Sequence, residues 1–165
     1  MSAPAINATL APIEGVLSTQ EQKHAVNGVH WLHKAEPRAL PAIAAAFREA
    51  GYILQMFTCL DFVDSDGVFR LVQQFAHGER LERHRVVCDV PAASEAPTIS
   101  AVYPGANWQE REIFDMFGLR FAGHPALERL LMPEDSTWHP LRRGFHDPST
   151  MPPPEAAAGG PDGAA

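Results

Sequence analysis

The sequence predicts an α+β fold: a two-layer domain, with an antiparallel or mixed sheet and helices on one face, followed by an extended C-terminal segment. Apolar residues recur at helical spacing in residues 37–50 and again in 107–117. Between these two stretches lie three strand-like stretches separated by short polar turns. A meander of strands flanked by helices is typical of domains in which helices cover one face of an antiparallel sheet.

The N-terminal part of the chain contains one well-defined helical pattern. Residues 1–28 hold no long periodic pattern, and we expect an arm with a weak helix at best. Residues 29–32 could form a short strand. A helix is predicted over 37–50, because proline is tolerated in a first turn and Gly51 is a natural stop. Its core face would consist of Leu40, Ile43, Ala44 and Phe47.

Three strands are predicted to follow this helix. The first covers 52–63, and the turn 64–67 ends in Asp-Gly, which adopts positive φ at little cost. The second covers 68–76 and the third 81–90, with a turn at 77–80 between them. We expect the first strand to direct Leu54, Met56, Leu60 and Phe62 to one face, and the second to direct Phe69, Leu71 and Phe75 to one side.

The C-terminal half divides into a helix, an irregular stretch and a tail. A loop at 91–97 and a short helix or turn at 98–102 lead to a helix over 107–117, which Gly118 ends. The next 27 or so residues show little periodicity but contain several large apolar side chains, which favours burial against a partner. The domain boundaries follow: an N-terminal arm at 1–28, the α+β domain at 29–118, an extended partner-binding segment at 119–147 and a disordered tail at 148–165.

Composition excludes several classes of protein. The chain has 165 residues, 45% apolar content and a net charge of −7, which argues against a nucleic-acid groove. No apolar stretch is long enough to span a bilayer, and residues 1–10 lack the pattern of a signal peptide, so we expect a cytoplasmic location. Cys59 and Cys88 are too few for an iron–sulfur cluster. We interpret them as small buried hydrophobes, although the sequence alone leaves a disulfide open.

The segment 107–118 is the most informative part of the sequence. On a helix, Trp108, Arg111, Glu112 and Asp115 share one face, while Ile113, Phe114 and Phe117 would pack on the sheet. The shared face could be a carboxylate pair for acid–base chemistry, a solvated ion-pair face or a protein interface. An interface fits best, because Arg111 would neutralise the carboxylates and exposed faces rarely carry tryptophan.

A second group of candidate residues lies beyond this helix. His124 and His139 each precede a proline, which favours an extended backbone at both histidines. Arg142 and Arg143 could bind carboxylates of a neighbouring protein or could remain solvated. The histidines form no helical pair or Cys/His cluster, so a metal site is not expected. No glycine-rich phosphate loop supports NAD or flavin binding.

These motifs resemble a known family. The run 103–118, continued by Phe121-Ala122-Gly123-His124-Pro125 and by His139-Pro140-Leu141-Arg142-Arg143, is similar to the signature of the C-type subunit of respiratory complex I. In mitochondria this is the 30-kilodalton-type subunit of NADH:quinone oxidoreductase. The resemblance covers roughly residues 29–145.

The resemblance implies a non-catalytic, cofactor-free subunit of a proton-translocating NADH:quinone oxidoreductase. It would lie in the peripheral arm on the cytoplasmic side of the membrane and contact the membrane only through the assembled complex. NAD, FMN, the iron–sulfur clusters and quinone would belong to partner subunits. Its partners would be the large quinone-site subunit and the iron–sulfur subunits, with no nucleic acid. The expected partner-interface residues are Trp108, Arg111, Glu112, Asp115, His124, Arg129, His139, Arg142 and Arg143.

Two departures from the family pattern keep an alternative open. Ser136, Thr137 and Trp138 stand where the family usually has a tryptophan and later a glycine, and Arg143-Gly144 replaces Lys-Asp. The equivalent subunit of a formate hydrogenlyase-type, membrane-bound nickel–iron hydrogenase is therefore the runner-up. A free-standing enzyme or an assembly factor with the same fold are further alternatives. Identifying the proteins that co-purify with the native chain would separate all of these.

Overall fold

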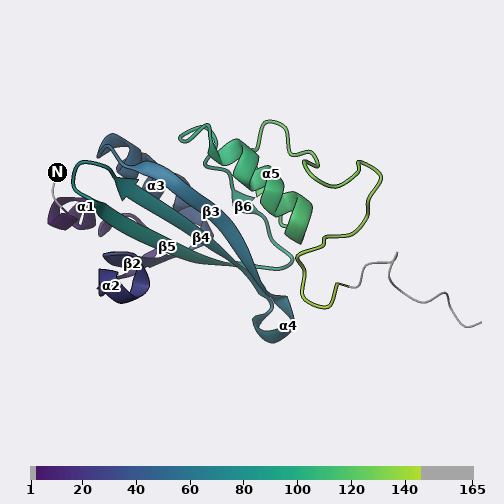
Figure 1. Cartoon of the computed structure of the whole chain (residues 1–165), viewed down its shortest axis with the longest axis horizontal. Helices are drawn as coiled ribbons and strands as arrows, with labels where there is room; N and C mark the ends of the chain where they lie inside the picture. Colours follow the sequence, from purple (N-terminus) through teal and green to yellow (C-terminus); the bar gives the residue numbers. More distant parts are fainter. Residues whose placement is uncertain (1–2, 146–165) are drawn as a thin grey trace, which may run out of the picture.

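A five-stranded mixed sheet forms the centre of the molecule. The computed structural model describes residues 3–145 of the chain (Figure 1). The strand order is β1-β2-β5-β4-β3, and every neighbouring pair is antiparallel except β2 and β5, which are parallel. The α+β class and the mixed sheet predicted from the sequence are therefore confirmed. The strands are β1 Val16–Glu21, β2 Trp31–Ala35, β3 Ile53–Phe62, β4 Val68–His77 and β5 Glu82–Pro91.

Two helices supply most of the cover on one face of this sheet. Helix α3 packs beside the 3₁₀ turn that precedes it, and α5 lies against β3 (Figure 1). A short parallel pair, β6 with β7, joins the segments on either side of α5. The helices are α1 Ala3–Leu10, α2 His24–Asn27, η1 Pro37–Ala39 (the 3₁₀ turn), α3 Leu40–Glu49, α4 Val63–Asp66 and α5 Ala106–Phe117, and the short pair is β6 Ala96–Pro97 with β7 Phe121–Ala122.

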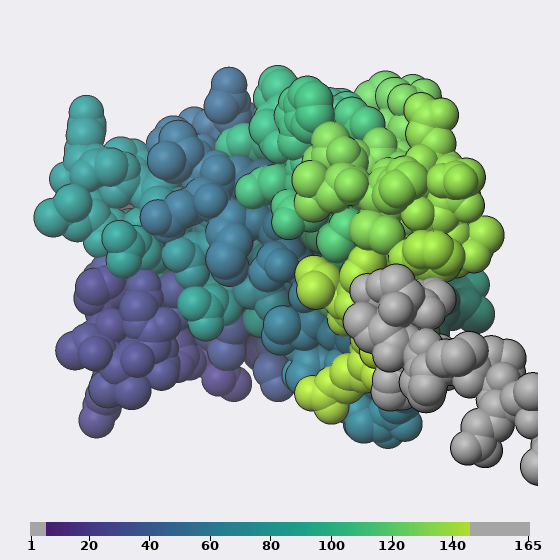
Figure 2. Space-filling view, turned by 45° about the vertical axis from the view of Figure 1, so that its right-hand side comes forward, coloured from purple at the N-terminus to yellow at the C-terminus, as the bar shows by residue number. Residues whose placement is uncertain are grey.

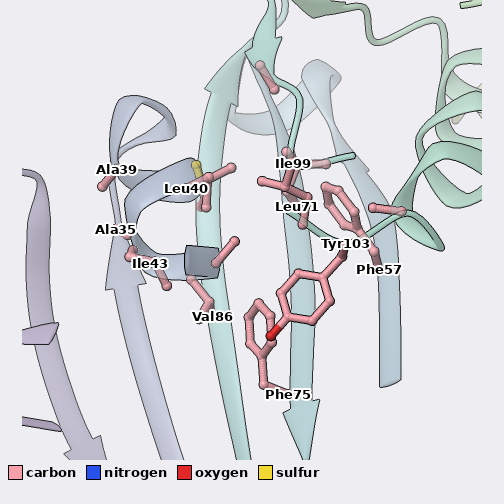
Figure 3. Close-up of a cluster of buried hydrophobic side chains, with 14 of the residues drawn as sticks. Ala35, Ala39, Leu40, Ile43, Phe57, Leu71, Phe75, Val86, Ile99 and Tyr103 are labelled. Carbon is pink, nitrogen blue, oxygen red and sulfur yellow. The ribbon is translucent and has the colours of Figure 1, made fainter. Parts of the chain in front are cut away.

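The core lies between α3, α5 and the sheet. From α3, Leu40, Ile43 and Phe47 are fully buried, as their helical spacing predicts. Phe47 stacks on Phe75 of β4 with ring centroids 4.3 Å apart (the core is drawn in Figure 3). Burying each such side chain stabilises the fold by roughly 1.5–3 kcal/mol. Phe69, Leu71 and Phe75 of β4 are all buried, so the prediction that they lie on one side of that strand is confirmed.

The N-terminal segment differs from its prediction as an arm. Strand β1 pairs along β2 and forms one edge of the sheet. Ile6 and Leu10 of α1 are fully buried in the core, and α1 contacts α3. This strand leaves no sign in the sequence, because an edge strand exposed on most of its residues has no alternating apolar pattern.

The face of β3 also differs from its prediction. A bulge between Leu54 and Met56 shifts the register of β3 against β4. One extra residue moves all later side chains to the opposite faces, so Phe57 and Cys59 enter the core. Leu60, predicted to share one face with Leu54, is 46% exposed, whereas Leu54 packs against the core.

The two cysteines are free thiols. Cys59 and Cys88 both lie opposite Leu71, one on each side of β4. Two strand spacings separate them by about 10 Å, which is beyond the reach of a disulfide. Burial raises the pKa of each thiol to about 12. The interpretation as small buried hydrophobes is confirmed.

Helix α5 and its extension form the candidate functional site

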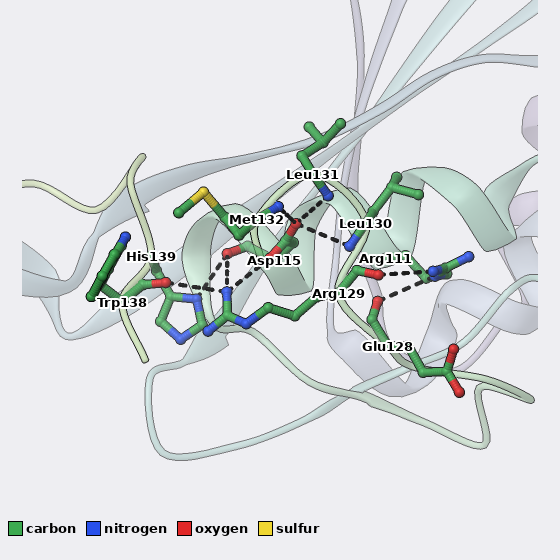
Figure 4. Close-up of polar contacts among 9 residues, drawn as sticks. All are labelled: Arg111, Asp115, Glu128, Arg129, Leu130, Leu131, Met132, Trp138 and His139. Carbon is green, nitrogen blue, oxygen red and sulfur yellow. Dashed lines mark hydrogen bonds and ion pairs between the residues drawn. The ribbon is translucent and has the colours of Figure 1, made fainter. Parts of the chain in front are cut away.

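Helix α5 directs a buried carboxylate toward the segment that follows it. Residues 119–145, which we call the extension, run from the end of α5 back over that helix (Figures 1 and 2). Asp115, on α5, has no exposed surface. Its Oδ2 accepts hydrogen bonds from the backbone N–H groups of Leu130, Leu131 and Met132, at 3.0, 2.6 and 2.9 Å (Figure 4). Three successive N–H groups thus converge on one carboxylate oxygen, as in a backbone anion nest.

Arg129 completes the environment of this carboxylate. Its Nη1 donates to Asp115 Oδ1 at 2.8 Å and to the carbonyl of Trp138 at 3.2 Å. Burial acts to raise the pKa of Asp115, but the N–H donors of the extension and the guanidinium outweigh it and lower the pKa to about 2. Asp115 is therefore an ion that holds the extension in place, and its two oxygens are occupied.

Two further side chains bind the backbone of the extension and of α5. Arg111 donates from Nε to the carbonyl of Glu128 at 3.2 Å and from Nη2 to the carbonyl of Arg129 at 2.9 Å. The Nδ1 of His139 donates to the carbonyl of Asp115 at 2.9 Å. A Cβ at Gly118 would lie 2.8 Å from the His139 ring, so only glycine lets that ring lie against the end of α5.

A buried acid on the inner side of α5 was missed by sequence reasoning. Glu110 is fully buried; its Oε1 accepts the N–H of Ile99 at 2.8 Å and its Oε2 the hydroxyl of Thr98 at 2.5 Å. Burial raises the pKa of Glu110 to about 7, although both hydrogen bonds oppose the rise. The spacing along the helix could have indicated its burial, because Glu110, Ile113 and Phe117 stand at i, i+3 and i+7 and therefore share the core face.

The ring of His124 lies beside this acid. Its side chain is fully buried, with Nε2 at 3.8 Å from Glu110 Oε2. Nε2 donates to the carbonyl of Asn107 at 3.2 Å, and Nδ1 accepts the N–H of Ala126 at 3.1 Å. One nitrogen donates and the other accepts, so this pattern fits the neutral ring. His124 thereby ties the start of the extension to the first turn of α5.

The far end of the extension is tied to the sheet. The buried carboxylate of Asp61, on β3, accepts the N–H of Arg143 at 2.8 Å and lies 3.4 Å from Nε of Arg142. The guanidinium of Arg142 lies 5.1 Å from the ring centre of Phe69, and that of Arg143 lies 5.5 Å from that of Phe62. Both arginines therefore contact this chain's own hairpin.

The residues predicted to form a partner interface are thus divided between two surroundings. Arg111, Asp115, Arg129 and His139 are brought together, and their bonds run within the chain. Trp108 and Glu112 point outward; Trp108 is 61% exposed, with the Arg111 guanidinium 5.2 Å from its ring centre. Whether any of these residues contacts a partner stays a prediction. His124, Arg142 and Arg143 complete the predicted set, and they lie at the two ends of the extension.

The apolar side chains of the extension are only partly accommodated by this chain. Leu127 and Met132 pack against the core. Leu131, Trp138 and Leu141 are 66%, 40% and 54% exposed. The backbone is fixed by its own domain while three large apolar side chains face outward. The predicted tail at 148–165 and residues 146–147 lie outside the described residues.

Two kinds of feature are absent from the described part of the chain. Within residues 3–145, no helix has the length and apolar character needed to cross a bilayer. The same residues contain no group of three or more His, Cys, Asp or Glu side chains that could hold a metal ion.

Comparison with known proteins shows which proteins this chain is similar to. The family model described as "Respiratory-chain NADH dehydrogenase, 30 Kd subunit" matches residues 33–150. The C-type subunit of NADH-quinone oxidoreductase from Herpetosiphon aurantiacus is 39% identical over 113 residues, covering 66% of this chain and 66% of that one. The J-type subunit of NAD(P)H-quinone oxidoreductase from Synechococcus sp. (strain WH7803) is 38% identical over 121 residues, covering 66% and 65%.

A longer relative and a solved structure extend the comparison. The C/D-type subunit of NADH-quinone oxidoreductase from Gluconacetobacter diazotrophicus is 37% identical over 130 residues, 72% of this chain and 22% of that one. The matched part thus spans just under two thirds of the first two relatives and about a fifth of the longer one. A chain of the membrane-bound sulfane sulfur reductase, an archaeal respiratory membrane complex, has a TM-score of 0.68, covering 88% of this chain and 86% of that one. At 20% identity it shows the shared fold alone.

The architecture is thus that of a small α+β protein with a mixed sheet, in which an irregular extension is hydrogen-bonded to the last helix. Among proteins built in this way, the chain belongs to the family of the 30-kDa, or C-type, subunit of respiratory-chain NADH dehydrogenase. The resemblance inferred from the sequence motifs is confirmed.

Proposed function

We propose that this chain is a structural subunit of an NADH:quinone oxidoreductase and that α5 with the extension is its docking surface. The chain itself would carry no redox cofactor and no catalytic group. Its partners would be the large quinone-site subunit and the iron–sulfur subunits of the same complex. The observation that carries this proposal is the group of exposed apolar side chains, Leu131, Trp138 and Leu141, on a backbone fixed by buried hydrogen bonds.

The rigidity of the extension supports a docking role. A segment that is ordered before binding loses less conformational entropy when a partner covers it. Asp115 and Arg129 hold its middle, and Asp61 holds its end near Arg143. Tryptophan and arginine are enriched among the residues that dominate binding energy, and Trp108 and Trp138 are both exposed here.

The carboxylates of the site give little support to a catalytic role. Asp115 accepts four hydrogen bonds through its side chain, and Glu110 is enclosed with both oxygens bonded. A general acid or base needs access to a reacting proton.

The C/D-type relative supports the choice of the large subunit as the neighbour of this chain. Its C/D-type name indicates that a C-type and a D-type subunit share one polypeptide in that protein. Two proteins that are joined in one relative are expected to lie side by side when they are separate. We therefore expect a protein of the D type to contact this chain in the assembled complex.

The proposal can be tested by truncating the exposed side chains in the intact complex. Trp138→Ala together with Leu141→Ala should lower the amount of assembled complex, and NADH:quinone reductase activity should fall in proportion. Leu81→Ala, at a 79% exposed turn residue remote from the extension, is the matched control and should leave both unchanged. Normal assembly with a collapse of turnover per complex would instead assign a catalytic role to the site.

A further inference from the structure

The sheet has a second face that the helices within residues 3–145 leave uncovered. Helices α3 and α5 supply core residues to one face, whereas the opposite face is hollowed into a groove of about 630 Å³. Side chains from all five strands line this groove. Its apolar residues include Leu17, Leu32, Met56, Leu60, Val72 and Val87.

The strand register shows how apolar and charged side chains are arranged on this face. Val87 of β5 lies directly opposite Val72 of β4, and Val72 lies opposite Thr58 of β3. Val87 and Val72 thus form an apolar pair at the centre of the face, with Lys34 and Thr58 beyond them in the same row. The apolar side chains of Leu32 and Met56 also line the groove. Arg70, Arg85 and Asp89 surround this apolar centre on the same face. An apolar centre inside a polar rim is the usual construction of a protein–protein interface.

The charges of the groove point to the chemistry of its cover. Both of its acids are already engaged: Asp89 with Arg70 at 2.6 Å, and Glu36 with Arg38 at 2.7 Å. The cations Lys34 and Arg85 are engaged less fully. Lys34 forms no close ion pair with any residue in 3–145 and acts on Asp89 only at longer range. Arg85 donates from Nη2 to Gln74 while its Nε is buried with no acceptor. In a chain of net charge −7, this face therefore has a local excess of positive charge.

We propose that an amphipathic helix of another subunit lies in this groove, with an apolar stripe over Val72 and Val87 and carboxylates against Lys34 and Arg85. A helix of about 10 Å diameter would form the missing second layer on this face of the sheet. A second copy docked through the same face is disfavoured, because a two-fold axis would bring the same cations together. The inference rests on the proposed role as a subunit, but it uses a surface separate from the extension.

The test is site-specific photo-crosslinking in the assembled complex. Benzoylphenylalanine replaces Thr58 or Leu60 in the groove, Trp138 in the extension, or Leu81 as the control turn position. The crosslinked peptides are then identified by mass spectrometry. From Thr58 and Leu60 we expect a product with one helical, acidic and apolar segment of another subunit, and from Leu81 no such product.

Each other outcome has a defined meaning. The inference is overturned by crosslinks from the groove to a second copy, to residues 146–165 of the same chain or to a segment without carboxylates. It is also overturned if Trp138 crosslinks to a partner and the groove positions do not. Groove crosslinks without any product from Trp138 would instead refute the proposed role of the extension alone.

Charge reversal provides a second, independent measurement. Lys34→Glu with Arg85→Glu should reduce the amount of this chain recovered in the purified complex by about tenfold at physiological salt, because two attractive pairs become repulsive. The conservative pair Lys34→Arg with Arg85→Lys should retain near-normal recovery. Equal recovery of the reversed and conservative variants would show that no carboxylates face these cations.

Discussion

Among the single residues of this protein, Asp115 is the one on which the conformation of the extension depends most directly. It joins three successive N–H groups and a guanidinium in a buried position, where a hydrogen bond to a charged acceptor contributes more than one to a neutral acceptor. Asp115 accepts hydrogen bonds from the N–H groups of the extension, and Arg111 donates hydrogen bonds to two carbonyls of the same segment. The helix therefore satisfies both the donors and the acceptors of a stretch that has little secondary structure.

Replacing Asp115 by asparagine should destabilise the fold by about 2–4 kcal/mol, because the charge that Arg129 and the N–H groups face is lost. Thermal unfolding of the purified chain would measure the loss, and limited proteolysis should show earlier cleavage within 119–145. Glu112→Gln makes the same chemical change at an exposed position of α5 and should have little effect. Equal effects of the two substitutions would contradict the role assigned to Asp115.

The pH dependence of this contribution has a definite sign. The folded-state pKa of Asp115 is lowered to about 2, below its ordinary value near 4. Its stabilisation is therefore complete above about pH 4 and is lost as pH falls toward 2. The difference in unfolding free energy between the wild type and Asp115→Asn should shrink across that range. A difference independent of pH would indicate that the substitution acts through packing and not through charge.

Arg111→Ala should lower the amount of assembled complex and the quinone reductase activity together, because the extension loses two of its backbone anchors. Native gel electrophoresis with an activity stain would measure both. Arg83→Ala, at an exposed arginine of β5, is the control. A normal amount of complex with low turnover would argue for a direct part in the reaction.

Among the elements of the fold, the junction between α5 and the extension depends on one glycine. Gly118 adopts φ of +82°, and the His139 ring occupies the space where a Cβ would lie. Gly118→Ala should therefore destabilise the chain by more than about 1 kcal/mol, from backbone strain and from displacement of His139. Gly67→Ala is a useful comparison in a thermal melt, because its φ is also positive but no atom lies within 4 Å of the added Cβ. The strain is common to both variants, so the larger loss at Gly118 measures the displacement of the ring.

A buried pair of histidines links β2 to β5 on the core side of the sheet. His33 Nε2 and His84 Nδ1 are 3.0 Å apart, and Thr19 and Tyr52 contact the outer nitrogens. Burial lowers the pKa of His33 to about 4; burial and then the neighbouring histidines lower that of His84 to about 3. The pair is therefore neutral in the folded domain at neutral pH.

This pair should make the domain less stable in mild acid. The unfolded chain takes up protons near pH 6.5 and the folded chain does not, so stability falls as pH drops from about 6.5 toward 4. His33→Asn with His84→Asn should flatten the dependence of the unfolding free energy on pH, measured in urea. His24→Asn, at an exposed histidine of α2, is the control. A slope unchanged by the core substitutions would contradict the assignment.

For the molecule as a unit, the stability contributions of Glu110 and of the histidine pair depend on pH with opposite signs. The folded-state pKa of Glu110 is raised to about 7, so its contribution favours folding below about pH 4.5 and is lost as pH rises toward 7. The histidine pair acts in the reverse direction over an overlapping range. Glu110→Gln should therefore steepen the loss of stability in acid, by up to about 1.4 kcal/mol for each pH unit. A shallower slope in the same urea titration would overturn this account.

The molecule also has two outward surfaces of different construction. The extension displays large apolar side chains on an irregular backbone, and the groove displays an apolar centre with a charged rim on a regular sheet. They arise from different elements, so a protein of this size could contact two neighbours at once. Crosslinking from Thr58 and from Trp138 would distinguish these contacts.

The local elements and the family could be predicted from the order of the amino acids alone. Helices α3 and α5 and strands β4 and β5 follow from periodicity and turn residues, which act over a few residues and are visible in a one-dimensional pattern. The run through α5 and the Gly-His-Pro and His-Pro-Leu-Arg segments led to the family that the comparisons show. The class of fold followed from the order of these elements.

Which atoms meet across the chain became visible only in three dimensions. The strand β1, the bulge in β3 and the burial of Glu110 and Asp115 all depend on partners far away in sequence. Periodicity placed Asp115 on the face of Trp108, but it could not show that the extension folds back and covers one part of that face. The physical reason is that burial and hydrogen bonding are set by contacts between distant segments, whereas helix and strand patterns are set by neighbours along the chain.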